Sequence, residues 1–250
     1  MTITHVQSTG TFADNVTSVA LAYGSNITTA DLLKIGVSAY KPSNDAFVVG
    51  DISKSAGTAT LDSFTLDRGH NQNPAGSDYN NVAIYSALVT GTGSCTITVG
   101  GAPAGSYFLI AVAEFSTSLT WDATRLEAVN SADSSSGAPD SGNVTSADDA
   151  LFFGALGVYT GSATTVTPDG AFTEIYESQS AAHQIGSFIY RIVTTGTTDA
   201  ASWTAPTVDD WAAAVTVDKE AAASGRTTKN TDPRPLGVFA GISRRVSNTP

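Results

Sequence analysis

The chain has 250 residues, of which 41% are hydrophobic and only 14% are charged, and its formal net charge is −11. This apolar fraction argues against a disordered chain, and the length can bury one large β domain or two small ones. Such an acidic balance argues against a nucleic-acid-binding body. With so few charges, the polar surface must come from Thr, Ser, Asn and Gly, which suits strands and turns better than helices.

The charges are unevenly distributed along the chain. Residues 1–218 contain 6 basic and 21 acidic side chains, a balance of −15, whereas residues 219–250 contain 6 basic and 2 acidic side chains, a balance of +4. A basic tail on an acidic body is expected to seek an acidic surface.

Short apolar or alternating runs recur between turn signals about every ten residues, which is typical of a sandwich or barrel. In the first half the predicted strands are Val16–Ala22, Leu32–Tyr40, Ala46–Ile52, Leu61–Leu66, Val82–Val89, Cys95–Val99 and Tyr107–Phe115. In the second half they are Leu126–Asn130, Leu151–Tyr159, Phe172–Glu177, Gly186–Val193, Ala201–Ala205 and Trp211–Val217. The alanine-rich run after Trp211 is interpreted as a strand, with a short helical turn near Lys219–Ala223 as the alternative.

The chain also repeats itself. Asn26–Asp31 and Asn143–Asp148 share the pattern N-[IV]-T-[TS]-A-D and precede strands that end at Tyr40 and Tyr159; further on, Ile84–Val89 is matched by Ile189–Val193. Two matches in the same order favour a duplication. Asp31 and Asp148 are expected to serve turn chemistry, with a side-chain oxygen accepting a backbone N–H.

We therefore expect an all-β sandwich of two sheets over residues 1–220, jelly-roll-like or a Greek-key relative, with similar halves at about 1–130 and 131–220. Each half supplies about four core strands, so two facing halves make eight. The polar segment Ser131–Gly142 is predicted to be the surface loop that joins the halves, with a flexible linker as the alternative. A second polar loop is predicted at Asn71–Tyr79.

These features resemble a duplicated β-sandwich unit that is common in phage virion proteins and bacterial surface proteins. The resemblance covers about residues 1–218 and implies a fold rather than a task, so no catalytic or binding residue is carried over from it. The matching segments are Ile3–Ser8, Thr28–Leu33, Ile84–Val89, Thr96–Val99, Ile110–Ser116, Ser146–Leu151 and Trp211–Ala214.

No catalytic, metal or cofactor motif stands out. His5, His70 and His183 are far apart in unrelated contexts, and the single cysteine, Cys95, lies in a strand-like run where a small buried hydrophobe is expected. We therefore expect no enzyme, no cofactor and no resident metal. The acidic pairs Asp45 with Asp51, Asp148 with Asp149 and Asp209 with Asp210 could hold calcium, but solvated turns are the expected reading.

Exposed aromatic side chains could stack on sugars. Trp121, in the loop-like stretch SLTWDAT, is the candidate glycan contact, whereas Trp203 and Trp211 lie in apolar alternations that favour the core. This keeps a carbohydrate-binding module or adhesin open as an alternative function. A polysaccharide lyase or hydrolase would need paired carboxylates in a groove, and the sequence offers no preferred pair.

Residues 221–250 are interpreted as an extended basic arm. An apolar patch, Pro235–Ile242, is flanked by arginines, and Pro233 and Pro235 favour an extended backbone. We expect the patch to bury on a neighbouring subunit while the arginines pair with acidic groups, with folding back on its own sandwich as the alternative. The predicted contact residues are Arg234, Leu236, Val238, Phe239, Ile242, Arg244 and Arg245.

The expected function is that of a structural protein of a phage particle, such as a capsid decoration or cement protein, with a tail or fibre component next. Its partners would be other protein subunits, including copies of itself, and neither nucleic acid nor membrane. The start of the chain lacks a basic region and an apolar core typical of a secretory signal. We expect synthesis in the host cytoplasm and residence in the virion, with the cell surface or extracellular space as the alternative.

Overall fold

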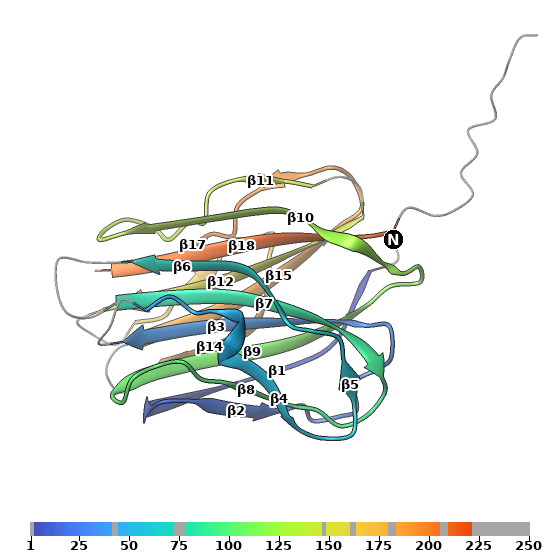
Figure 1. Cartoon of the computed structure of the whole chain (residues 1–250). Coiled ribbons are helices and arrows are strands. Elements are labelled where there is room, and N and C mark those ends of the chain that lie inside the picture. Colours follow the sequence, from blue (N-terminus) through green and yellow to red (C-terminus); the bar gives the residue numbers. More distant parts are fainter. Residues whose placement is uncertain are drawn as a thin grey trace, which may run out of the picture.

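Figure 1 presents the computed structural model of the chain, in which two β-sheets stack on one another. The structure describes residues 3–41, 45–72, 79–146, 149–160, 164–179, 184–205 and 210–221, and all of their side chains except those of residues 122 and 123. Strands dominate throughout, and the one helical element among these residues is the short 3-10 turn η1 (Val49–Asp51). The predicted all-β class is therefore confirmed. Within the described ranges, no helix has the length and apolar character needed to cross a membrane.

The first main sheet has the strand order β1-β9-β3-β7, and both β5 and β6 pair with β7. All of these pairings are antiparallel. The strands are β1 (Thr4–Val16), β3 (Leu32–Lys41), β5 (Thr60–Leu61), β6 (Thr65–Gln72), β7 (Tyr79–Gly91) and β9 (Ser106–Ser116).

The second main sheet has the order β10-β18-β12-β15-β14, also antiparallel. Its strands are β10 (Trp121–Ser134), β12 (Ala150–Tyr159), β14 (Thr173–Gln179), β15 (Gln184–Val193) and β18 (Asp210–Glu220). Leaving the two-residue β5 aside, the two sheets have the same topology. When the five strands of each sheet are numbered in chain order, their spatial order from one edge to the other is first, fifth, second, fourth and third.

The inner faces of the two sheets pack against each other around equivalent strands. The rings of Tyr40 in β3 and Tyr159 in β12 stack with their centroids 4.9 Å apart and their planes 7° from parallel. Near the middle of β3, Gly36 leaves room for the ring of Phe188 from the opposite sheet. A continuous apolar cluster from both sheets fills this interface and excludes water from it.

Small sheets cover the outer faces. The first main sheet is covered by β2 (Val19–Ala22), β8 (Thr96–Val99) and β4 (Ile52–Ala56) in the order β2-β8-β4. The second is covered by two pairs, β11 (Val144–Thr145) with β16 (Thr198–Asp199) and β13 (Thr167–Pro168) with β17 (Trp203–Thr204). The two stacked main sheets agree with the predicted two-sheet sandwich, but the structure has more strands than the eight expected, and smaller sheets flank the main pair. Because each main sheet is covered on both faces, its central strands are buried along almost their whole length.

Most predicted strands are present, with two informative differences. The strand β1 was not among the predicted ranges, because its mostly small and polar residues give little apolar signal. Instead of one strand over Ala46–Ile52, the 3-10 turn η1 precedes β4. The segment after Trp211 is a strand as far as Glu220, and residues 222–223 of the helical alternative lie outside the described residues.

The predicted junction at Ser131–Gly142 is also wrong. The chain passes from the first main sheet to the second between Ser116 and Trp121, and β10 continues to Ser134. Small polar residues at the end of β10 resemble a loop in sequence, but Ser131 and Asp133 contact the polar side chains of β6, and Asp133 is also exposed to solvent.

The predicted match of Ile84–Val89 with Ile189–Val193 differs by one residue from the equivalence that the structure shows. Pairing with β3 places Gly36 opposite Ile84, and pairing with β12 places Ala155 opposite Phe188. Gly36 lies four residues before Tyr40, and Ala155 lies four residues before Tyr159, so these two positions are equivalent. Their strand partners Ile84 and Phe188 are therefore equivalent as well. Ile189 instead faces the outer cluster, since a shift of one residue moves a side chain to the other face of a strand.

Candidate functional site

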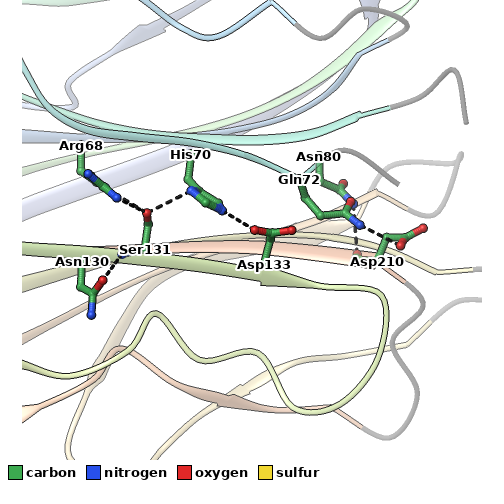
Figure 2. Close-up of polar contacts among 8 residues, drawn as sticks. All are labelled: Arg68, His70, Gln72, Asn80, Asn130, Ser131, Asp133 and Asp210. Atoms are coloured by element: carbon green, nitrogen blue, oxygen red, sulfur yellow. Dashed lines mark hydrogen bonds and ion pairs between the residues drawn. The ribbon is translucent and has the colours of Figure 1, made fainter. Parts of the chain in front are cut away.

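A row of polar side chains closes one edge of the interface between the main sheets. We call it the polar seam: Arg68, His70 and Gln72 of β6 together with the residues that they contact on β7, β10 and β18 (Figure 2). Alternate residues of a strand point to the same face, so these three side chains project together toward the second sheet. The contacted residues are Asn80, Ser131, Asp133 and Asp210, and Asn130 adds a hydrogen bond that its Oδ1 accepts from the backbone N–H of Ser131.

His70 lies between a hydroxyl and a carboxylate. Its Nδ1 is 3.0 Å from Ser131 Oγ, and its Nε2 is 2.7 Å from Asp133 Oδ1. Arg68 donates to the same Ser131 Oγ from Nε at 2.9 Å and from Nη2 at 2.6 Å. Because the oxygen accepts two hydrogen bonds from Arg68, its own hydrogen is directed to Nδ1, and Nε2–H donates to Asp133.

Serine, histidine and aspartate therefore meet as in nucleophilic hydrolases, but the two ring nitrogens are exchanged, with Nδ1 facing Ser131 and Nε2 facing Asp133. Two features favour a structural role here. The lone pairs of Ser131 that would attack a substrate are engaged by Arg68, and Ser131 and Asp133 lie two residues apart on one strand, opposite β6. The arrangement therefore ties the edge strand of one sheet to the edge strand of the other.

The seam continues with amide groups toward the other end of β6. Gln72 donates from Nε2 to Asp210 Oδ1 at 2.8 Å, and Asn80 donates from Nδ2 to the Asp210 carbonyl oxygen at 3.0 Å. These contacts hold β6 and β7 against the first residue of β18. Within the seam, each of these side chains bridges the two sheets.

Deeper in the interface lies a buried charge cluster formed by Lys34, Asp67, Ser86, Arg125 and Asp218. Lys34 Nζ is 2.6 Å from Asp67 Oδ2 and 2.6 Å from Asp218 Oδ2. The side chains of Lys34 and Asp218 are fully buried, and that of Asp67 is 1% exposed. Ser86 Oγ donates to Asp67 Oδ1 at 2.8 Å, and Arg125 Nη2 donates to Ser86 Oγ at 2.8 Å.

Burial and mutual attraction set the protonation of this cluster. Burial acts to lower the pKa of Lys34, but the carboxylates of Asp218 and Asp67 outweigh it, so the net direction is upward. Burial raises the pKa of the Asp218 carboxyl, although Lys34 acts in the opposite direction. The favoured state of Lys34 is therefore an ammonium, and burial favours the protonated form of Asp218.

A second buried acidic site joins the turn before β3 to β9. Glu114 is fully buried and accepts hydrogen bonds from Gln7 Nε2 and from the backbone N–H of Thr28, both at 2.6 Å. The neighbouring Asp31 is 6% exposed. Burial, with the adjacent Glu114, raises the pKa of Asp31 to about 7. Thus Asp31 contributes to the turn through a carboxyl group packed against Glu114, while its counterpart Asp148 lies outside the described residues.

The structure places the three predicted tryptophans in the core. Trp121 is 7% exposed and belongs to the cluster between the main sheets, which corrects the expectation of an open ring that could stack on a sugar. Trp203 and Trp211 are 1% and 5% exposed, as predicted for core residues. All predicted contact residues of the arm, Arg234, Leu236, Val238, Phe239, Ile242, Arg244 and Arg245, lie outside the described residues.

Other candidate chemistry is accounted for by packing. Cys95 is 2% exposed in the outer cluster of the first sheet, and burial raises the pKa of its thiol. His5 stacks on Tyr190 at 4.9 Å, on the opposite edge of the interface from His70. Across the described ranges, no three His, Cys, Asp or Glu side chains are grouped so that they could hold a metal ion.

No protein-family model, curated protein or solved structure matches the chain. The site therefore has to be interpreted from its own geometry. The sequence analysis did not single out the buried charge cluster, although one signal was visible. Lys34 interrupts the apolar run Leu32–Tyr40, and a lysine in a fully buried strand requires a partner.

Proposed function

We propose that this chain is a structural subunit of a phage-type particle that is held to neighbouring subunits by its basic C-terminal segment, residues 222–250. Its body is a rigid sandwich whose polar side chains tie the two sheets together. A capsid decoration or cement role fits such a body, with a tail or fibre component as the variant of the same idea.

The proposal rests on how the positively charged side chains of the body are paired. Each of the six basic side chains in residues 1–218 has a hydrogen-bond or ion-pair partner within the same part of the chain. These side chains are Lys34, Lys41, Lys54, Arg68, Arg125 and Arg191. The 21 acidic side chains of the same residues outnumber them, so the body carries an acidic surplus that a basic segment can neutralise.

The edges of the sheets support docking through side chains rather than strand addition. The edge strands β1, β6, β10 and β14 each carry a register shift against their inner neighbour. Bulges twist an edge away from the flat geometry that another strand needs. We therefore expect the C-terminal segment to lie on an acidic face, with Leu236, Val238, Phe239 and Ile242 buried beneath its arginines.

We further propose that the body arose by tandem duplication of a jelly-roll-like unit. The shared strand order of the two main sheets and the stacking of the equivalent residues Tyr40 and Tyr159 support this. Two units that pack by equivalent faces reproduce the geometry of a symmetric dimer within one chain. Duplicated sandwiches of this kind fit the resemblance to virion and surface proteins.

The test compares the full chain with a chain that ends at Ala221. Both should give the same strand-rich circular dichroism and the same cooperative unfolding, because the truncation keeps both sheets. Light scattering at low salt should show an oligomer for the full chain and a monomer for the truncated chain. High salt should weaken the oligomer, since exposed ion pairs are screened.

A synthetic peptide of residues 222–250 adds a second measurement. It should bind the truncated chain, and a control peptide with Arg234, Arg244 and Arg245 replaced by Ser should bind more weakly. A monomeric full chain would contradict the assignment to a neighbouring subunit, and a peptide that does not bind would remove the acidic face as its target.

A further inference from the structure

The buried charge cluster occupies a position that the fold fills elsewhere with aromatic rings. Counting back equally from the stacked tyrosines makes Lys34 equivalent to Phe153. The pairing of Leu32 with Phe115 and of Leu151 with Asp218 makes Phe115 equivalent to Asp218. The contact between Lys34 and Asp218 therefore corresponds to the edge-to-face contact of Phe153 with Phe115, whose centroids are 6.5 Å apart.

Packing alone therefore does not require charges at this position. A buried ion pair is often no more stabilising than a well-packed apolar pair, because both charges lose their hydration. At this place the interface between the sheets holds one lysine and two carboxyl groups. The equivalent place in the same interface holds two phenylalanines. This difference suggests that the three charged groups serve chemistry as well as packing.

We propose that Lys34 and Asp218 condense spontaneously to an amide, a covalent cross-link between β3 and β18 that joins the two main sheets. Lys34 Nζ is in contact with Asp218 at 2.6 Å, and the two residues are 184 positions apart in the sequence. Asp67, also 2.6 Å from Nζ, acts as the proton acceptor and donor for the reaction. The inference rests on this cluster and is independent of the proposed function.

At rest Lys34 is an ammonium, because the two carboxylates raise its pKa, so the reaction begins with transfer of a proton from Lys34 to Asp67. An amine attacks a carboxyl carbon only when the amine is neutral and the acid is protonated. Burial raises the pKa of Asp218, which favours the acid form, and Asp67 is placed to accept a proton from Lys34. Held in contact and away from water, the two reactants gain the effective concentration of an intramolecular reaction.

The step balances without an external reagent. Lys34 transfers one proton to Asp67, and its nitrogen then bonds to Cγ of Asp218. The C–O bond to the hydroxyl group of Asp218 breaks, and that group leaves as water after it takes a proton from Asp67. The second proton of the attacking nitrogen passes to Asp67, which releases it to solvent. No oxidation or reduction occurs.

Arg125 is placed to stabilise the intermediate. Its Nε lies 3.7 Å from Asp218 Oδ1, and neither atom has a hydrogen-bond partner among the described residues. A buried donor that faces a buried oxygen just beyond hydrogen-bonding distance can approach it when negative charge develops there. The same guanidinium is anchored through Nη2 to Ser86, which in turn donates to Asp67.

Intact-mass measurement of the purified, denatured full chain tests the proposal directly. The mass should be lower than the sequence mass by one water molecule, after allowance for removal of Met1. Lys34→Arg and Asp67→Asn should each abolish this loss. Asp210→Asn is the matched control. Asp210 lies on β18, as Asp218 does, but it belongs to the polar seam, so this variant should retain the loss of one water molecule.

Proteolysis and tandem mass spectrometry then locate the bond. A branched peptide that links Lys34 to Asp218 supports the proposal even if a variant fails to fold. A folded wild-type chain at full sequence mass would overturn it. So would a water loss confined to a linear peptide, as in succinimide formation, or a branch from Lys34 to Asp67.

Discussion

The carboxyl pair of Asp31 and Glu114 gives a sharp prediction for stability against pH. Asp31 is 6% exposed, and its pKa is raised from an ordinary value of 3.8 to about 7. A carboxyl group whose pKa is higher in the folded state favours folding when it is protonated. Its contribution is complete below the unfolded pKa near 4 and is lost as the pH rises through about 7.

The magnitude follows from the pKa shift. A rise from 3.8 to about 7 corresponds to roughly 4 kcal/mol at high pH, at about 1.4 kcal/mol for each pKa unit. The pair lies next to a surface turn that can relax and admit water, so we expect about half of this value, ~2 kcal/mol. Asp31→Asn keeps a donor for Glu114 but cannot ionise.

Urea unfolding from pH 4 to pH 8.5 checks this. At pH 8 the Asp31→Asn chain should be more stable than wild type by ~2 kcal/mol, and the difference should shrink toward pH 4. The exposed Asp14→Asn is the control, with a change below about 0.5 kcal/mol at every pH. A difference that is independent of pH, or an Asp31→Asn chain that is less stable at pH 8, would refute the reasoning.

Three further predictions concern packing and the seam. Gly36→Ala places a new Cβ 2.2 Å from the ring of Phe188, so urea unfolding should show a loss of about 1–3 kcal/mol; an unchanged midpoint would argue against the close contact of the sheets. Cys95 should react with a thiol reagent at least ~100-fold more slowly in the native chain than in denaturant, and comparable rates would show that the outer cluster is open. His70→Ala removes the bridge to Ser131 at a half-exposed edge and should cost about 1 kcal/mol in unfolding, with a much larger loss contradicting an edge role.

The central strands could be predicted from the sequence because most of their residues are apolar, as in Leu32–Lys41 and Ala150–Tyr159. The covering strands β11, β13 and β16 were out of reach for a physical reason. Strands of two residues, such as β11 and β13, are too short to show any periodicity. A Thr-rich edge strand such as β1 lacks apolar alternation, so its position depends on pairing with β9.

The buried charge cluster shows the same limit. Lys34 could be recognised as unusual from its apolar neighbours alone. Its partners Asp67 and Asp218 are 33 and 184 positions away, and only the stacking of the two sheets brings them together. Neither aspartate is marked by local sequence, because turn and surface aspartates are common throughout this acidic chain.

The most direct test of the assembly claim is carboxyl-to-amine cross-linking in a mixture of isotopically light and heavy full-length chains. Lys229 lies in the C-terminal segment and can be coupled to acidic residues of the body. The account predicts cross-linked peptide pairs that combine one light and one heavy partner. Pairs that are only light with light and heavy with heavy would show that the segment contacts its own subunit, and would contradict the account.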